Sequence, residues 1–155
     1  MPQKEQVPTF MVEDARIIYR NFAGRETLYN LPGNRNFAVI LDEETAKQML
    51  EDGWNVKWPK PGEEGDIGDP FVSVAVQFKY YPPRIVMITS KARTTPLTED
   101  MVEVLDWADI AKVDLICRGN VWNDKGDIKA YVKTMFVTIN EDPLELKYSI
   151  NEVEG

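Results

Sequence analysis

Alternating apolar and polar residues predict that most of this chain forms β-strands. The clearest case is residues 71–79, where Val72, Val74, Val76 and Phe78 alternate with small or polar side chains. Because successive side chains of a strand point to opposite faces, this pattern predicts one buried face and one open face. Other β-rich stretches predict strands at 11–19, 35–41, 84–89, 112–118 and 128–140.

One segment instead follows helical spacing and has clear ends. Asp42 is a natural N-cap, and Gly53 is a typical residue at which a helix stops. Between them, Ala46, Met49 and Leu50 form an apolar face. The sequence therefore predicts a helix from 42 to 53.

A second helix is predicted over about residues 99–108. Thr98 precedes it as a cap, and apolar side chains recur at helical spacing. These side chains are Met101, Val104, Leu105 and Ala108. Residues 54–58, after the first helix, predict a short strand.

The order of these elements fits a mostly β protein with two helices, built as an OB-fold-like five-stranded Greek-key barrel. The five strands are assigned to 11–19, 35–41, 71–79 (with 84–89), 112–118 and 128–140. Residues 42–58 are a helix–strand insertion between the second and third strands, and an α+β sheet of another topology is the alternative. One domain is expected over 11–140, with 1–10 and 141–155 as flexible or peripheral termini.

The composition makes most enzyme chemistries improbable. The 155-residue chain has no histidine, which removes Ser-His-Asp and Cys-His catalysis and histidine-based metal sites. Its one cysteine, Cys117, lies in a strand-like stretch and is expected to be a small core residue. There is no Walker A or GxGxxG pattern, and no acidic cluster matches an EF-hand. We therefore predict no enzyme, no cofactor and no metal site.

Charge is distributed unevenly along the chain. The net charge is −8, yet residues 71–93 carry four bases and no acid, and residues 110–139 carry five bases against three acids. The acids concentrate in 42–69 and 94–109. A positive sheet on an acidic body disfavours loose polyanion binding but is compatible with a defined polyanion groove.

The last long strand carries the sharpest candidate chemistry. Lys129, Tyr131 and Lys133 share one face of it, so amines can follow phosphates while the ring stacks on a base. On this stripe alone, the simpler interpretation is a solvated face whose lysines discourage aggregation. The preceding loop, 119–127, contains Trp122, which is either a lid on the core or a ligand-stacking residue.

Bases and aromatic rings also lie together in other segments. The loop 20–34 contains Arg20, Phe22, Arg25 and Tyr29, whose rings have an alternative role as anchors to the core. Trp54 and Trp58 share a strand face, which is more often core or interface. The hairpin 79–84 adds Lys79, Tyr81 and Arg84. In an OB barrel, the loops 20–34 and 119–127 flank the binding face.

Four segments together resemble a family of small bacteriophage proteins that are regarded as OB-fold single-stranded DNA-binding proteins. They are Arg20–Gly24, Gly33–Val39, Glu51–Lys57 and Pro83–Val86. The resemblance covers roughly residues 16–140 and implies an accessory of phage DNA replication or recombination in the cytoplasm of the infected host. A cytosolic location also agrees with a chain that shows no membrane-length apolar run and no signal-peptide layout. In this sequence the C-terminal acids are sparse and no terminal aromatic follows them, which departs from the partner-recruiting tail of many such binders.

The leading hypothesis is therefore sequence-tolerant binding of single-stranded DNA by phosphate ion pairing and base stacking. The expected contacts are Arg20, Phe22, Arg35, Trp54, Lys79, Tyr81, Arg84, Arg118, Trp122, Lys129, Tyr131 and Lys133. Replication or recombination proteins and further copies of the chain are open as partners, and no membrane is expected. The alternative is an acidic protein-interaction module that inhibits a host protein as a DNA mimic, which the charge of −8 favours and the basic strands oppose.

Overall fold

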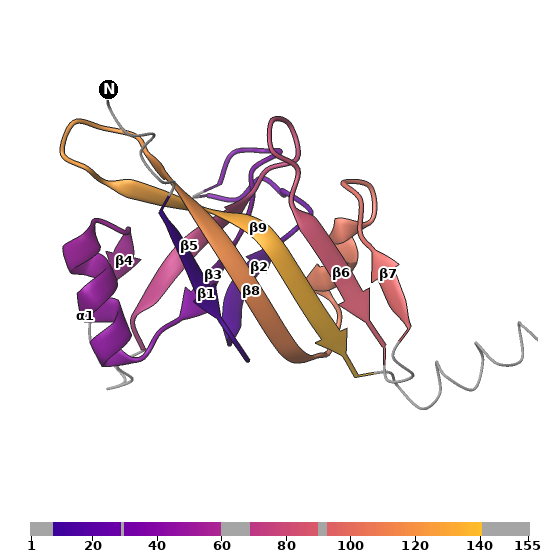
Figure 1. Ribbon diagram of the computed structural model, residues 1–155. Coiled ribbons are helices and arrows are strands. Elements are labelled where there is room, and N and C mark those ends of the chain that lie inside the picture. The colour runs from indigo at the N-terminus through magenta and orange to yellow at the C-terminus, as the bar shows by residue number, and fades with distance from the viewer. Residues whose placement is uncertain (1–7, 29, 60–68, 90–92, 141–155) are drawn as a thin grey trace, which may run out of the picture.

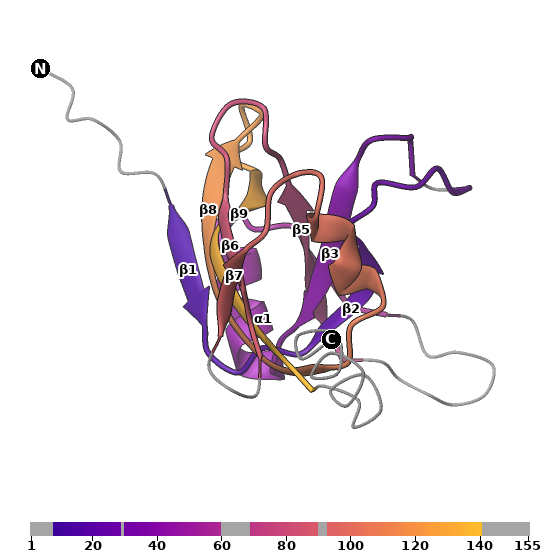
Figure 2. The same cartoon turned by 90° about the vertical axis from the view of Figure 1, so that its right-hand side faces the viewer.

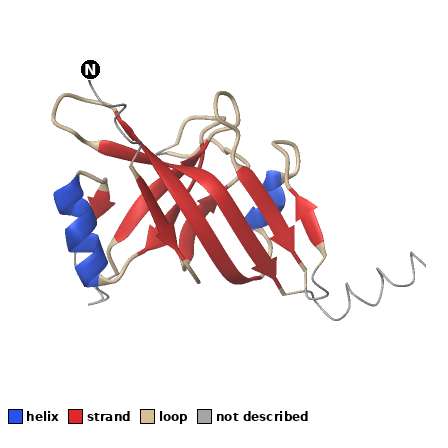
Figure 3. Cartoon of the chain, in the orientation of Figure 1, coloured by secondary structure: helices blue, strands red, loops and turns tan. Residues whose placement is uncertain are grey.

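The computed structural model describes residues 8–28, 30–59, 69–89 and 93–140, which form a mostly β structure with one α-helix (Figures 1 and 3). The helix α1 is Glu43–Asp52, and a 3₁₀ helix, η1, is Val102–Asp106. No helix in these ranges has the length and apolar character that a membrane crossing requires. The strands are β1 Thr9–Val12, β2 Ile17–Asn21, β3 Arg35–Ile40, β4 Val56–Lys57, β5 Phe71–Val76, β6 Arg84–Ile88, β7 Thr94–Pro96, β8 Ile110–Val121 and β9 Ile128–Ile139.

Within the described ranges, the strands form one mixed nine-stranded sheet. Its main path is β1-β8-β9-β5-β3-β2, and β4, β6 and β7 attach beside this path. The strand β9 pairs antiparallel with β8, while β5 and β6 both run parallel to it at different points along its length. Figure 2 shows the consequence: β8, β9, β6 and β7 lie on one side, and β5, β3 and β2 lie across from them.

A bulge in β9 coincides with this change of partner. Ile116 pairs with Thr134, but Cys117 pairs with Val132, so Lys133 is an extra residue in the ladder. A bulge bends its strand and increases the local twist. The bend lies between the part of β9 that pairs with β5 and the part that pairs with β6.

The predicted alternation in β5 is confirmed, because Val72, Val74 and Val76 are buried in the core. Ser73 and Ala75 lie on the other face, where they are partly exposed. The same core contains inward-facing side chains from both sides of the curved sheet, including Cys117 of β8, whose thiol pKa is raised by burial. The expected role of Cys117 as a core residue is confirmed.

Both ends of the first predicted helix are confirmed. The Asp42 carboxylate accepts a hydrogen bond from the Thr45 backbone N–H at 2.7 Å, and this bond lowers the pKa of Asp42. Gly53 ends α1 with a φ of 105°, and a Cβ there would lie 2.6 Å from the carbonyl oxygen of Gly126. Leu50, predicted on the apolar face, is instead half exposed. The predicted short strand after α1 is β4, so the helix–strand segment lies between β3 and β5.

The prediction of a second α-helix is wrong. The described chain has only the short η1 in this region, with Val102 and Leu105 fully buried. Met101 and Val104, which were expected to face the core, are exposed. A spacing of three between buried residues matches the tighter 3₁₀ helix, in which side chains three apart eclipse.

The five-stranded barrel is not confirmed, because the sheet path ends at two separate strands, β1 and β2. The predicted strand 11–19 is divided at Asp14, where φ is 51° and the backbone N–H donates to the Asp114 carboxylate. As a result β1 pairs with β8, whereas β2 pairs with β3. The first strand begins at Thr9, within the N-terminal segment 1–10 that was predicted to be flexible or peripheral. Residues 1–7 of that segment and the predicted C-terminal segment 141–155 lie outside the described residues.

Candidate nucleic-acid interface

An open groove of about 1290 Å³ lies along the outward face of β3, β5 and β9. Ser73, Ala75 and Gln77 form its floor and are small or uncharged, so they leave space above the sheet. Positive charge predominates in its lining, which favours a polyanion. The charged lining residues are the cations Arg20, Arg25, Arg35, Lys79 and Lys129 and the acids Glu99 and Asp106.

A cluster of stacked cations and rings begins at the β9 side of this groove. Arg118 of β8 and Tyr131 of β9 are direct cross-strand partners, and the guanidinium carbon lies 5.0 Å from the ring centroid of Tyr131. The same guanidinium lies 4.9 Å from the ring of Tyr81, and the Lys129 amine lies 5.4 Å from Tyr131. A guanidinium held against a ring keeps its planar edge of donors for other partners. We call these four residues the β8–β9 cluster.

The turn between β8 and β9 holds Trp122 in an exposed position. The Asn123 side-chain oxygen accepts hydrogen bonds from the backbone N–H groups of Lys125 and Asp127, at 3.0 and 3.1 Å. The Trp122 backbone N–H donates to the Asp127 carbonyl at 3.1 Å. This hydrogen-bonded turn leaves the Trp122 side chain 63% exposed, and the ring lines the groove. Two roles were predicted for Trp122, a lid on the core or a ligand-stacking residue. A ring this exposed is open to ligands and does not cover the core.

Arg35 lies at the groove with only part of its side chain available. Its Nη1 is 3.2 Å from the Glu99 carboxylate, and its guanidinium carbon lies 5.8 Å from the ring centroid of Phe78. The Nε atom is buried and makes no hydrogen bond within the described structure. Glu99 therefore occupies part of the donor edge of this arginine.

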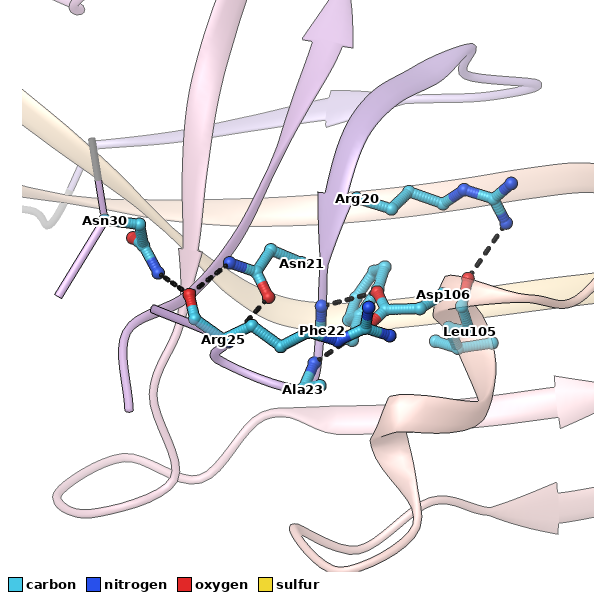
Figure 4. Close-up of polar contacts among 8 residues, drawn as sticks. All are labelled: Arg20, Asn21, Phe22, Ala23, Arg25, Asn30, Leu105 and Asp106. Atoms are coloured by element: carbon cyan, nitrogen blue, oxygen red, sulfur yellow. Dashed lines mark hydrogen bonds and ion pairs between the residues drawn. The ribbon is translucent and has the colours of Figure 1, made fainter. Parts of the chain in front are cut away.

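The wall formed by η1 and the loop after β2 is fixed by polar contacts (Figure 4). The Asp106 carboxylate accepts hydrogen bonds from the backbone N–H groups of Phe22 and Ala23, at 2.7 and 3.0 Å. Arg20 donates from Nη1 to the carbonyl oxygens of Leu105 and Ala108 at 2.9 and 2.8 Å. The predicted phosphate contact Arg20 is thus occupied in holding the end of η1.

The structure brings together half of the predicted contacts in the groove lining and places two more beside it. Arg84 and Lys133 lie outside the lining, and the Arg84 guanidinium covers the ring of Phe136 at 5.6 Å. Lys133 is exposed at the bulge. The residues in the lining are Arg20, Arg35, Lys79, Trp122, Lys129 and Tyr131, and those beside it are Tyr81 and Arg118.

Two predicted stacking residues must be corrected because their rings are buried. Phe22 is fully buried and stacks on Phe37, with 5.1 Å between ring centroids. Trp54 is buried beneath the β8–β9 hairpin, where a Cβ on Gly119 would lie 2.7 Å from its ring. Phe10 also packs edge-on against Trp54 at 4.8 Å. Neither ring offers a free face to a base, so both serve the core.

The sequence matches the family model described as "Putative phage ssDNA-binding domain" over residues 1–154. The chain belongs to this family. The resemblance predicted from the sequence is therefore confirmed. No curated protein matches the chain.

Solved structures support the fold of this phage ssDNA-binding domain. The single-stranded DNA-binding protein from bacteriophage Enc34 matches with a TM-score of 0.53 at 9% identity, over 87% of this chain and 83% of that one. A C-terminal truncation of the same protein matches with a TM-score of 0.52 at 11% identity, over 87% and 88%. At such low identity the likeness shows the fold alone.

Trp107 and Arg25 line the groove of this phage ssDNA-binding domain but were not among the predicted contacts. Trp107, just after η1, is 63% exposed and lines the groove beside Arg25. The sequence placed Trp107 inside a predicted helix whose apolar face did not include it. Its signal was present nevertheless, since a tryptophan between Asp106 and Ala108, off the predicted apolar face, has no assigned place in the core.

Proposed function

We propose that this protein binds single-stranded DNA in the groove over β3, β5 and β9, without sequence preference. The observation that carries the proposal is the groove itself, in which cations and exposed rings share one open lining. The family assignment supports the same ligand. The role proposed is phage DNA replication or recombination in the cytoplasm of the infected bacterium.

In the proposed mechanism, phosphates pair with Lys79, Lys129 and the free edge of Arg118. Bases stack on Tyr131 and Trp122, whose rings lie in the groove lining. Stacking is sequence-tolerant because every base has a π-face, and it contributes roughly 1–3 kcal/mol per base. Tyr81 extends the surface past the groove, because it shares the Arg118 guanidinium with Tyr131. Replication or recombination proteins and further copies of the chain are proposed as partners on the family assignment alone.

The decisive experiment is a titration of the full chain with a labelled oligo-dT, followed by fluorescence anisotropy and by tryptophan quenching. We expect saturable binding, and roughly 5- to 150-fold weaker binding for Tyr131→Ala and for Trp122→Ala. Trp58→Ala is the matched control, because Trp58 is 39% exposed but lies outside the groove lining. Equal affinity for Tyr131→Ala, Trp122→Ala and the control would reject this face.

The titration also tests the acidic interaction module as the alternative. A wild-type chain that does not bind oligo-dT even at low salt, yet forms a salt-sensitive complex with a basic protein, would favour a DNA mimic. The basic groove predicts the opposite result, because its lining would repel a basic partner.

A further inference from the structure

We propose that Trp107 and Arg25 form a second binding subsite for one base and its phosphate, on the η1 wall of the groove. This inference rests on the proposed function, since it concerns the same DNA strand. It adds a contact on the side of the molecule that carries β2 and β3, whereas Tyr131 belongs to β9. Figure 2 shows η1 beside β2 and β3, with β8 and β9 on the other side.

The Trp107 side chain is available to a ligand. It is 63% exposed, as much as Trp122, and both rings line the same groove. A tryptophan buries a large apolar area when it packs, so an exposed one in a groove marks an interaction site rather than a core position. The residues that anchor η1 are Val102 and Leu105, so the ring of Trp107 is not needed to hold the helix.

The backbone that carries Trp107 is held on both sides. Immediately before it, the Asp106 carboxylate accepts the two hydrogen bonds from Phe22 and Ala23. Immediately after it, the Ala108 carbonyl accepts a hydrogen bond from Arg20. The ring is therefore presented from a fixed position, which reduces the ordering cost of binding.

Arg25 places a cation next to the ring. Its guanidinium carbon lies 5.8 Å from the Trp107 ring centroid, and its Nη2 lies 3.8 Å from the Asp106 carboxylate. The Arg25 backbone is fixed by Asn21, whose side-chain amide accepts from the Arg25 N–H at 2.9 Å and donates to the Arg25 carbonyl at 3.1 Å. Its side chain remains 59% exposed, so donors are left for a phosphate.

The chemistry of the pair defines its ligand. A ring with an adjacent guanidinium fits a nucleotide unit, in which the base stacks on the indole while the phosphate pairs with the arginine. A strand that lies along the groove would then contact the β8–β9 cluster and Trp122 on one side and this pair on the other. The subsite therefore lengthens the stretch of DNA that one protein molecule holds.

The test compares Trp107→Ala, Trp107→Phe and the control Trp58→Ala by anisotropy with a labelled oligo-dT, using the full chain. We expect roughly 5- to 150-fold weaker binding for Trp107→Ala, near wild-type binding for Trp107→Phe, and no change for the control. Arg25→Gln should make the plot of log K against log salt less steep by about 0.7, since one phosphate contact is lost. Unchanged thermal unfolding of Trp107→Ala confirms that the loss is not one of folding.

The failures of the two proposals are distinguishable. Wild-type protein that does not bind oligo-dT would reject the proposed function as a whole. Wild-type protein that binds, while Trp107→Ala binds as tightly as Trp58→Ala, would reject the second subsite alone. Combining Trp107→Ala with Tyr131→Ala provides a further check, because free-energy losses at separate subsites should be additive.

Discussion

The ring of Phe22 lies fully buried against Phe37 although its neighbours Asn21 and Arg25 line the groove. Truncation of a buried phenylalanine leaves a cavity and removes packing, at a cost of about 3–5 kcal/mol. We expect Phe22→Ala to lower the free energy of unfolding by that amount, measured by urea denaturation followed by tryptophan fluorescence. If the variant unfolded at the wild-type urea concentration but lost DNA affinity, the ring would have to be a ligand contact.

Glu99 is the acid that limits the use of Arg35. The ion pair joins a mostly exposed carboxylate to a mostly buried guanidinium. A glutamine amide oxygen at position 99 can still accept a hydrogen bond, which limits the loss of stability. We expect Glu99→Gln to bind oligo-dT roughly twofold to tenfold more tightly, with a salt slope steeper by about 0.7, because Arg35 becomes free for a phosphate.

Glu103→Gln is the matched control for that change. Glu103 lies in η1, four residues after Glu99, and is exposed, but it does not line the groove. The same gain in both variants would mean that only the net charge had changed. A gain confined to Glu99→Gln would identify Arg35 as the released contact.

At the scale of elements, η1 and the loop after β2 depend on one carboxylate. Asp106 is largely buried and accepts two backbone hydrogen bonds while it contacts Arg25. Asp106→Asn removes the charge and replaces one acceptor by a donor, so a backbone N–H is left unpaired at a cost of about 1–3 kcal/mol. We expect a lower Tm and weaker DNA binding together, measured by thermal unfolding and anisotropy. Asp109→Asn, at an exposed position nearby, should change neither.

The elements that could be predicted from sequence are those whose signals are local. The helix α1 carries its own start and stop at Asp42 and Gly53, and β5 carries its own alternation. In contrast, η1 is fixed by contacts between Asp106 and residues 83 and 84 positions away, which no local pattern encodes. The bulge at Lys133 is set by β-pairing in the same way.

The same contrast between local signals and long-range contacts explains which residues of the candidate site could be predicted. Tyr131 and Lys129 were predicted because they share a strand face, and the turn residues around Trp122 indicated an exposed loop. Phe22 and Trp54 have the same residue types as true groove rings, and only the tertiary packing separates them. Trp107 was missed because it lay inside a predicted α-helix, off the apolar face, and no binding role was considered for the other faces of that helix.

For the whole molecule, the decisive property is the separation of charge rather than its sum. The net charge is −8, yet the groove lining has five cations and two acids. Among these, Arg20 donates to the backbone just after η1, and Asp106 accepts from the backbone of the loop after β2. A strand that pairs with three or four cations, drawn from the rest of the lining and from Arg118 beside it, should release counterions at about 0.7 per phosphate. We expect log K for oligo-dT to fall with log salt at a slope of about −2 to −3, which is roughly a 15- to 60-fold loss between about 50 and 200 mM. Lys129→Gln should reduce the slope, whereas Lys47→Gln on α1, outside the groove, should not. Binding that salt does not weaken would contradict phosphate pairing, and it would leave stacking alone to explain how an acidic protein holds DNA.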